Sequence, residues 1–304
     1  MKILKVKPVL FMLTILLCAA CTEEIISPEI TAGSTTTTAT PTTLATDING
    51  FPIDIGGSHT PYVLGSTEAK YGYYLYRPYN YSFTTLKYPL LIFLHGKAER
   101  GDGTSSLTVL NRVLNTGIPR MIKDGKWKIT NPMLVVSPQF YGTTGNLNNW
   151  GGGNVLNLKT FIEYMISHYR VDPKRIYLTG LSHGGNGVFD YLTMQDDATS
   201  YIAAAAPVAA YGPQGGLWRC NETPVWSFVG ESDVTNFNTT KSFTTKYNAQ
   251  VPAPLYQAKL SAFKNAGHDV WTRTYNGTGI GTADPVFNPF NQALFDWMYL
   301  HKRP

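Results

Sequence analysis

The feature that most constrains this fold is a strand pattern that ends in a serine between glycines and continues as a helix. In the stretch RIYLTGLSHGGNG, residues 176–178 are typical of a buried strand, and residues 184–194 follow with a helical pattern. The sequence GLSHG at 180–184 matches Gly-x-Ser-x-Gly. Either the turn is too tight for large side chains, or it holds Ser182 out for chemistry. The flanking elements favour the second interpretation, because a nucleophile elbow follows a strand and opens a helix.

Strand and helix patterns alternate along most of the chain, which predicts an α/β fold with a mostly parallel central sheet. The run at 90–94 is apolar at every position, as in a parallel strand that helices cover on both faces of the sheet. We expect strands near 71–77, 90–94, 133–139, 175–180 and 224–230, and helices over 155–170, 184–194 and 291–302. The active site should then lie where the parallel strands end, at their carboxyl edge.

The N-terminal segment predicts export. Lys2, Lys5 and Lys7 precede an apolar run too short to span a bilayer comfortably, as in a signal peptide, here assigned to residues 1–20. The stretch LLCAAC resembles the lipobox of bacterial lipoproteins, in which Cys21 would carry the lipid, although Cys18 stands where Leu is usual. An ordinary signal peptide cleaved nearby is the alternative interpretation.

Residues 21–46 are rich in Thr, Ser, Ala and Pro and predict a lipidated flexible tether, because so little apolar surface cannot offset the entropy of ordering. The acidic pair that follows Cys21 resembles export signals of surface lipoproteins in Gram-negative bacteria. We therefore expect a protein anchored by lipid to the outer membrane or cell surface. Residues 47–304 remain as one catalytic domain.

Charge argues against a nucleic-acid partner. The chain has 25 Lys and Arg and 20 Asp and Glu; three lysines leave with the signal peptide, so the net charge falls to +2. Cysteine usage leaves only Cys220 in the catalytic domain, so we expect no intrachain disulfide there.

A serine hydroxyl is a weak nucleophile without a base, and in a strand-elbow-helix arrangement the acid and the histidine follow the serine in chain order. Two histidines follow His183: His268 in NAGHDVW, and His301 near the C-terminus, where fraying is common. His268 is therefore the predicted base. Asp233, just after the strand at 224–230, is the predicted acid, with Glu231 as the runner-up. Asp269 adjoins the histidine and is a poor candidate.

An oxyanion hole needs two backbone N–H groups, one from the residue after the nucleophile and one from the loop after an earlier strand. These donors are predicted to be His183 and Lys97, the second following the strand at 90–94. His95 precedes the serine in the chain and is predicted to brace this loop rather than act as a base.

The segments YPLLIFLHGKAERGDG, RVDPKRIYLTGLSHGG, PVWSFVGESD and GHDVW together resemble the α/β-hydrolase superfamily, and more closely its branch of esterase D-like carbohydrate esterases and predicted peptidases. The resemblance runs from about Tyr71 to the last helix and implies an acyl-serine hydrolase. Two positions depart from the usual pattern: Ala98 stands where Gly is frequent, and His183 where Met is frequent. Neither change removes a backbone donor.

The same resemblance implies acetyl or feruloyl esters on extracellular polysaccharide as substrates. Trp150 is placed either to stack on a sugar or aromatic acyl group, or to pin the glycine-rich loop around it. A serine peptidase and a catalytically inactive glycan-binding lipoprotein remain as alternatives. No cofactor is implied, and no His, Cys or Asp cluster has metal-ligand spacing.

Overall fold

The computed structural model describes residues 45–47, 50–128, 130–142, 150–194 and 201–304. The chain divides into two units, Met1–Thr43 and Leu44–Pro304. The predicted signal peptide, Cys21 and the predicted tether up to residue 44 lie outside the described residues. Among the helices that are described, none combines the length and the apolar character needed to cross a membrane.

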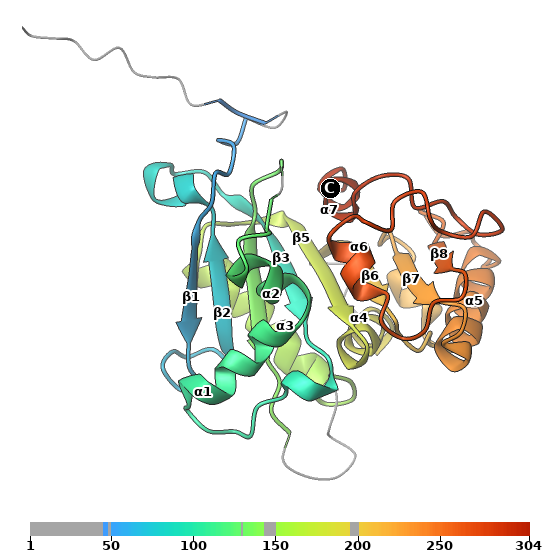
Figure 1. Ribbon diagram of the computed structural model, residues 1–304, viewed down its shortest axis with the longest axis horizontal. Helices are drawn as coiled ribbons and strands as arrows, with labels where there is room; N and C mark the ends of the chain where they lie inside the picture. The colour runs from blue at the N-terminus through green and yellow to red at the C-terminus, as the bar shows by residue number, and fades with distance from the viewer. Residues whose placement is uncertain (1–44, 48–49, 129, 143–149, 195–200) are drawn as a thin grey trace, which may run out of the picture. The chain divides into compact units, whose positions relative to one another are not determined.

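In the described residues, one eight-stranded sheet forms the centre of the second unit, in the order β1-β2-β4-β3-β5-β6-β7-β8 (Figure 1). The two pairings that involve β2 are antiparallel, and all others are parallel. The strands are β1 Ser58–Tyr62, β2 Gly72–Arg77, β3 Tyr88–Leu94, β4 Leu134–Gln139, β5 Val171–Leu181, β6 Ile202–Val208, β7 Trp226–Gly230 and β8 Lys259–Phe263. The expected mostly parallel sheet is confirmed.

Both faces of the sheet are covered, because every residue of β3, β4, β6 and β7 is buried and successive strand residues face opposite sides. The helices are α1 Leu107–Leu110, α2 Gly117–Lys123, α3 Asn154–His168, α4 His183–Met194, α5 Val234–Asn248, α6 Trp271–Tyr275 and α7 Leu294–Tyr299. Two short 3-10 helices matter below, η1 Tyr79–Phe83 and η2 Lys97–Glu99.

Some elements differ from the sequence expectation. The last helix spans six residues rather than the twelve of 291–302. Three strands, β1, β6 and β8, were not expected from the sequence pattern. Strand β6 reads IAAAAPV, and alanine is depleted in strands, so only its central position between β5 and β7 makes it extended.

The parallel arrangement fixes where the functional loops lie. Strand β3 leads into η2, β5 into Ser182, and β7 into the segment that carries Asp233. Because the carboxyl ends of parallel strands share one edge of a sheet, these three loops and the loop after β8 converge there.

Candidate active site

Ser182 occupies the turn between β5 and α4 in the left-handed region of backbone conformation, with φ +53°. A non-glycine residue pays a steric cost there, and such strain collects at functional positions. The Ser182 N–H donates to the carbonyl of Val208 at the end of β6, 2.9 Å away, which anchors the turn to the neighbouring strand. The strand-to-helix elbow expected from the sequence is present.

Glycines in the elbow are required by close backbone approach. A Cβ atom added to Gly180 would lie 2.5 Å from the Gly184 carbonyl. One added to Gly184 would lie 1.9 Å from the carbonyl oxygen of Leu94, at the end of β3. Any side chain at either position would therefore push the serine turn away from the neighbouring loop.

Three side chains from separate loops form one hydrogen-bonded row. His268 Nε2 lies 2.9 Å from Ser182 Oγ, and His268 Nδ1 lies 2.6 Å from Asp233 Oδ2. A carboxylate can only accept, so Nδ1 carries the proton and Nε2 is left to accept from the serine hydroxyl. The His268 side chain is 44% exposed and that of Asp233 is 17% exposed, so the row is open to solvent at the histidine.

The competing carboxylates are directed elsewhere. Glu231 lies beside Asp284, and burial followed by that neighbouring carboxylate raises the pKa of Glu231. Asp269 Oδ1 accepts a hydrogen bond from Thr272 Oγ1 over 3.3 Å, and the residue lines a cavity of about 390 Å³ between α2 and α6. Of the three acids considered from the sequence, only Asp233 contacts the His268 ring.

His301 lies toward the opposite edge of the sheet. Its carbonyl accepts a hydrogen bond from Tyr177, and Arg303 nearby donates to Lys174 near the start of β5, whereas Ser182 follows the end of that strand. Burial lowers the pKa of His301 to about 4. His301, the other histidine that follows the serine in the chain, is therefore remote from Ser182.

Asn236, which sequence reasoning missed, supports the acid. Its Nδ2 donates to Asp233 Oδ2 over 2.8 Å and also lies 3.4 Å from the carbonyl oxygen of Ala209. Asp233 is the N-cap of α5, so Asn236, three residues later, stands on the same first turn. The sequence feature that could have predicted this contact is an amide side chain three residues after the candidate acid.

Both predicted oxyanion donors stand at the first residue of a helix, Lys97 in η2 and His183 in α4. The N–H of a first helical residue has no acceptor within its own helix. The two loops touch, because a Cβ added to Gly96 would lie 2.9 Å from a methyl group of Leu181. The loops that carry these two N–H groups are therefore neighbours at the serine turn.

Buried groups hold the loop after β3. His95 is 1% exposed, and its Nε2 accepts the N–H of Phe140 over 2.9 Å, as expected of a brace. Burial lowers the pKa of His95 to about 4, so the ring is neutral. Glu99 is 4% exposed, and burial raises the pKa of its carboxyl, which also accepts from the Gly96 N–H.

Trp150 corrects one expectation. It is 1% exposed, its Nε1 donates to the carbonyl of His95 over 3.1 Å, and its ring packs against Tyr71 and Phe140. A side chain enclosed in this way has no free face for a sugar or an acyl group. The tryptophan braces the loop after β3, which is the other role that the sequence left open.

The surroundings of His183 are positive. Burial, then the charges of Lys97 and Arg100, and then His268, lower the pKa of the His183 imidazole. Cations that disfavour a protonated histidine favour an anion at the same place. Within the part of the chain that the structure describes, no group of three or more His, Cys, Asp or Glu side chains could hold a metal ion.

No model of a known protein family matches the sequence. A bifunctional acetylxylan esterase/xylanase of Neocallimastix patriciarum is 28% identical over 170 residues, which are 55% of this chain and 22% of that protein. Poly(3-hydroxyalkanoate) depolymerase C of Paucimonas lemoignei is 30% identical over 112 residues, which are 33% of this chain and 25% of the relative. The chain thus spans a quarter or less of the length of these curated relatives.

Solved structures share the architecture. A thermostable esterase superposes with a TM-score of 0.57 at 22% identity, covering 83% of this chain and 64% of the other. The feruloyl esterase module of Clostridium thermocellum, complexed with sinapinate, gives a TM-score of 0.50 at 17% identity, covering 83% and 93%. The chain has the α/β-hydrolase fold, as its motifs predicted.

Proposed function

We propose that this protein is a serine hydrolase that cleaves carboxylic esters through an acyl-enzyme. The observation that carries the proposal is the row from Asp233 Oδ2 through the His268 ring to Ser182 Oγ, with contacts of 2.6 and 2.9 Å. These distances suit a base that takes the serine proton and an acid that orients the base.

In the first step Ser182 Oγ attacks the ester carbonyl carbon while His268 Nε2 takes the hydroxyl proton. The proton then passes to the oxygen of the leaving alcohol, and the acyl group stays on the serine. A water molecule, deprotonated by the same nitrogen, attacks the acyl-enzyme, and the proton returns to Ser182 Oγ as the bond to the serine breaks and the acid is released. Asp233 holds the imidazole and stabilises its cation in both halves.

The backbone N–H groups of Lys97 and His183 are the proposed donors to the developing oxyanion. Both stand at helix starts, and α4 adds the partial positive charge of its N-terminus. The positive surroundings of His183 act in the same direction. Removing one such donor costs about a hundred- to a thousandfold in turnover in comparable sites.

The proposed substrates are acetyl or feruloyl esters on an extracellular polysaccharide. Local similarity to an acetylxylan esterase/xylanase supports this class. Similarity to a poly(3-hydroxyalkanoate) depolymerase supports the same ester chemistry on a different polymer. The serine peptidase and the inactive glycan-binding protein are the competing proposals.

One panel of substrates tests the activity. Purified protein should give a burst of nitrophenol from nitrophenyl acetate in proportion to enzyme, and should release acid from acetylated xylan or feruloylated arabinoxylan. Cleavage of peptide amides in preference to all esters would replace the esterase with a peptidase. Absence of a burst with retained binding to glycan would identify a binding protein.

We also propose that Cys21 carries a lipid that anchors the protein outside the cytoplasm, on the outer membrane or cell surface of a Gram-negative bacterium. The lipobox-like LLCAAC and the tether after it support this. The lipid on this one cysteine would supply the whole anchor. Cys21→Ser should therefore move the protein into the soluble fraction. Unchanged fractionation with membranes would contradict the lipid proposal.

A further inference from the structure

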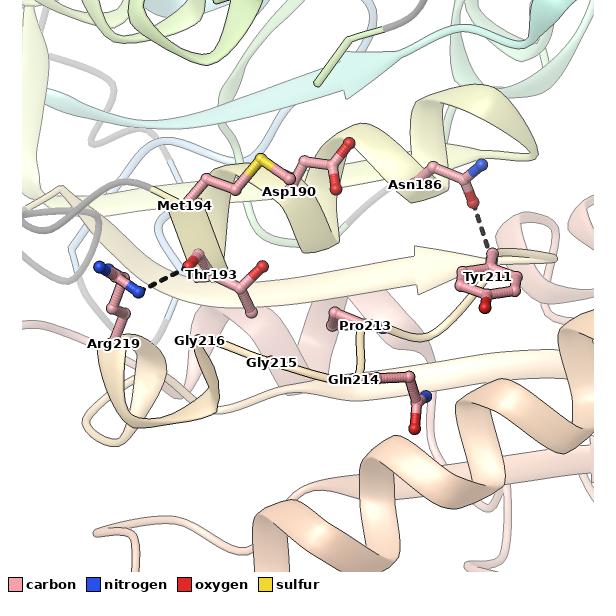
Figure 2. Close-up of a pocket in the computed structure, with 10 residues that line it drawn as sticks. All are labelled: Asn186, Asp190, Thr193, Met194, Tyr211, Pro213, Gln214, Gly215, Gly216 and Arg219. Atoms are coloured by element: carbon pink, nitrogen blue, oxygen red, sulfur yellow. Dashed lines mark hydrogen bonds between the residues drawn. The ribbon is translucent and has the colours of Figure 1, made fainter. Parts of the chain in front are cut away.

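A cavity of about 660 Å³ lies between α4 and the segment that follows β6. Figure 2 shows Asn186 and Tyr211 at one end, Thr193 and Arg219 at the other, and Asp190 between them on α4. Its volume falls in the range of about 300–1,000 Å³ that is common for small-molecule sites. The proposed catalytic residues do not line it, so it has no part in the steps given above.

The end of this cavity that Asn186 and Tyr211 form is connected to Ser182 by backbone hydrogen bonds. The Asn186 N–H donates to the Ser182 carbonyl, so this residue lies one helical turn after the serine. The Tyr211 N–H donates to Asn186 Oδ1 over 2.7 Å, and the serine N–H is bonded to Val208, three residues before the tyrosine. A ligand in the cavity would therefore extend away from the reacting ester along α4.

The cavity offers one aromatic face and one carboxylate. Tyr211 is 47% exposed at the rim. Asp190 has no hydrogen-bond or ion-pair partner among the residues that the structure describes, and burial alone raises its pKa to about 6. A carboxylate that is partly withdrawn from water and unpaired is costly unless a ligand supplies donors.

The wall opposite α4 is already fixed in place. Gln214 donates to the Gly212 carbonyl, and its Oε1 accepts from Ser242 and from Lys246 on α5. Gly216 has φ +71°, and a Cβ there would lie 2.2 Å from the Thr193 carbonyl oxygen. A ligand would meet a preformed site and pay little for ordering it.

We propose that this cavity binds a neutral sugar unit of the polysaccharide, next to the unit that carries the ester; this rests on the proposed function. A pyranose ring has an apolar C–H face for Tyr211 and neighbouring hydroxyls that can donate to the Asp190 carboxylate. The Asn186 amide, whose oxygen is engaged by Tyr211, adds donors from Nδ2.

Two variants test the subsite, Tyr211→Ala and Asp190→Asn, and the second preserves shape if the first folds poorly. Each should raise KM for acetylated xylo-oligosaccharides on the order of tenfold, as for the loss of a charged hydrogen bond or an aromatic contact. Values of kcat and KM for nitrophenyl acetate should stay unchanged. The matched control is Tyr79→Ala on η1, which is 50% exposed and follows β2 away from the serine edge.

Several outcomes separate the subsite from the proposed function. Equal KM for the oligosaccharides in all variants would overturn the subsite and leave the esterase standing. A raised KM for methyl ferulate, with oligosaccharide binding unchanged, would overturn it in favour of an acyl pocket. If the wild type hydrolyses nitrophenyl acetate but no xylan ester, the polysaccharide assignment fails.

A binding measurement with unesterified xylohexaose then decides the subsite by itself, through calorimetry on the wild type and the Asp190→Asn variant. Binding that the substitution weakens about tenfold would support the sugar site. Absence of binding, or binding that neither Asp190→Asn nor Tyr211→Ala changes, would overturn it.

Discussion

The loops on the two sides of Ser182 are held in different ways. The loop after β3 is fixed by enclosed side chains, since His95, Glu99 and Trp150 are each at most 4% exposed. The loop after β8 is fixed by its backbone, with the Ser232 N–H bonded to the Ala266 carbonyl over 2.9 Å. It presents the His268 side chain, which is 44% exposed.

This difference follows from what each loop supplies. An oxyanion hole made of backbone N–H groups has no side chain to adjust, so the whole loop must be immobilised. A base works through one ring that has to meet solvent and leaving group, and its orientation comes from a single carboxylate. Substitutions in the two loops should therefore have different effects. Those on the histidine side should lower kcat, and those on the oxyanion side should lower the free energy of unfolding.

The largest effect is expected at the row itself. Ser182→Ala and His268→Ala should each lower kcat for nitrophenyl acetate on the order of a millionfold, and the double variant should be little worse, because the two act as a unit. Melting temperatures should stay near that of the wild type. Substantial esterase activity in Ser182→Ala would contradict the assignment, as would loss of activity on adding a chelator to the wild type.

The next effect concerns the acid. Asp233→Asn should lower kcat about 10⁴-fold, since the positioned serine and histidine remain but the ring loses its correct tautomer. Glu231→Gln is the matched control, as it follows the same strand and lies beside Asp284 instead. If the control lowers kcat more than Asp233→Asn does, Glu231 is the acid and the observed contact is not the productive one.

Lowering the pH should reduce the stability that the buried His95 ring in the loop after β3 contributes. The pKa of His95 is about 4 in the folded protein and about 6.5 when unfolded, so the unfolded chain binds more protons between these values. Stability is complete above pH 6.5 and falls as the pH drops toward 4, by about 3 kcal/mol for this residue. His95→Gln should flatten that part of the urea-unfolding profile. Stability that rises on acidification would rule out the buried neutral ring.

The smallest effect should come from the tryptophan brace. Trp150→Phe removes the Nε1–H donor to the His95 carbonyl and should lower the free energy of unfolding by about 1–2 kcal/mol, with only a few-fold loss in kcat. Trp218→Phe, at a residue 60% exposed, is the control that should change neither. A KM change for oligosaccharides without loss of stability would instead restore Trp150 as a substrate contact.

Much of the fold follows from local sequence patterns. The apolar run at 90–94 and the helical spacing at 155–170 predicted β3 and α3 because burial on one face or two imposes a recognisable period. Strand β6 was not predicted, because its alanines have no preference for a strand and are extended only by pairing with the two neighbouring strands. The last helix was overestimated at both ends: Ala293 has an extended backbone, and after Tyr299 the N–H groups of Leu300 and His301 bond three rather than four residues back.

The sequence by itself determined the elbow, the chain order of serine, acid and histidine, and the positions of both proposed oxyanion donors. Each of these depends on residues a few positions apart, or on which strand a residue follows. The Gly-x-Ser-x-Gly match between a strand and a helix could be recognised locally, although the contact that excludes a side chain at Gly184 is a tertiary one, with Leu94 of β3.

Only the tertiary structure decided between Asp233 and Glu231, which follow the same strand two residues apart. The outcome depends on how the loop after β8 crosses β7, since Gly230 would clash with Gly267 if it carried a side chain. The burial of Trp150 and the pairing of Tyr211 with Asn186 are set in the same way, by packing between segments distant in the chain. Such contacts leave no period in the sequence, because their partners are chosen by the fold rather than by neighbouring residues.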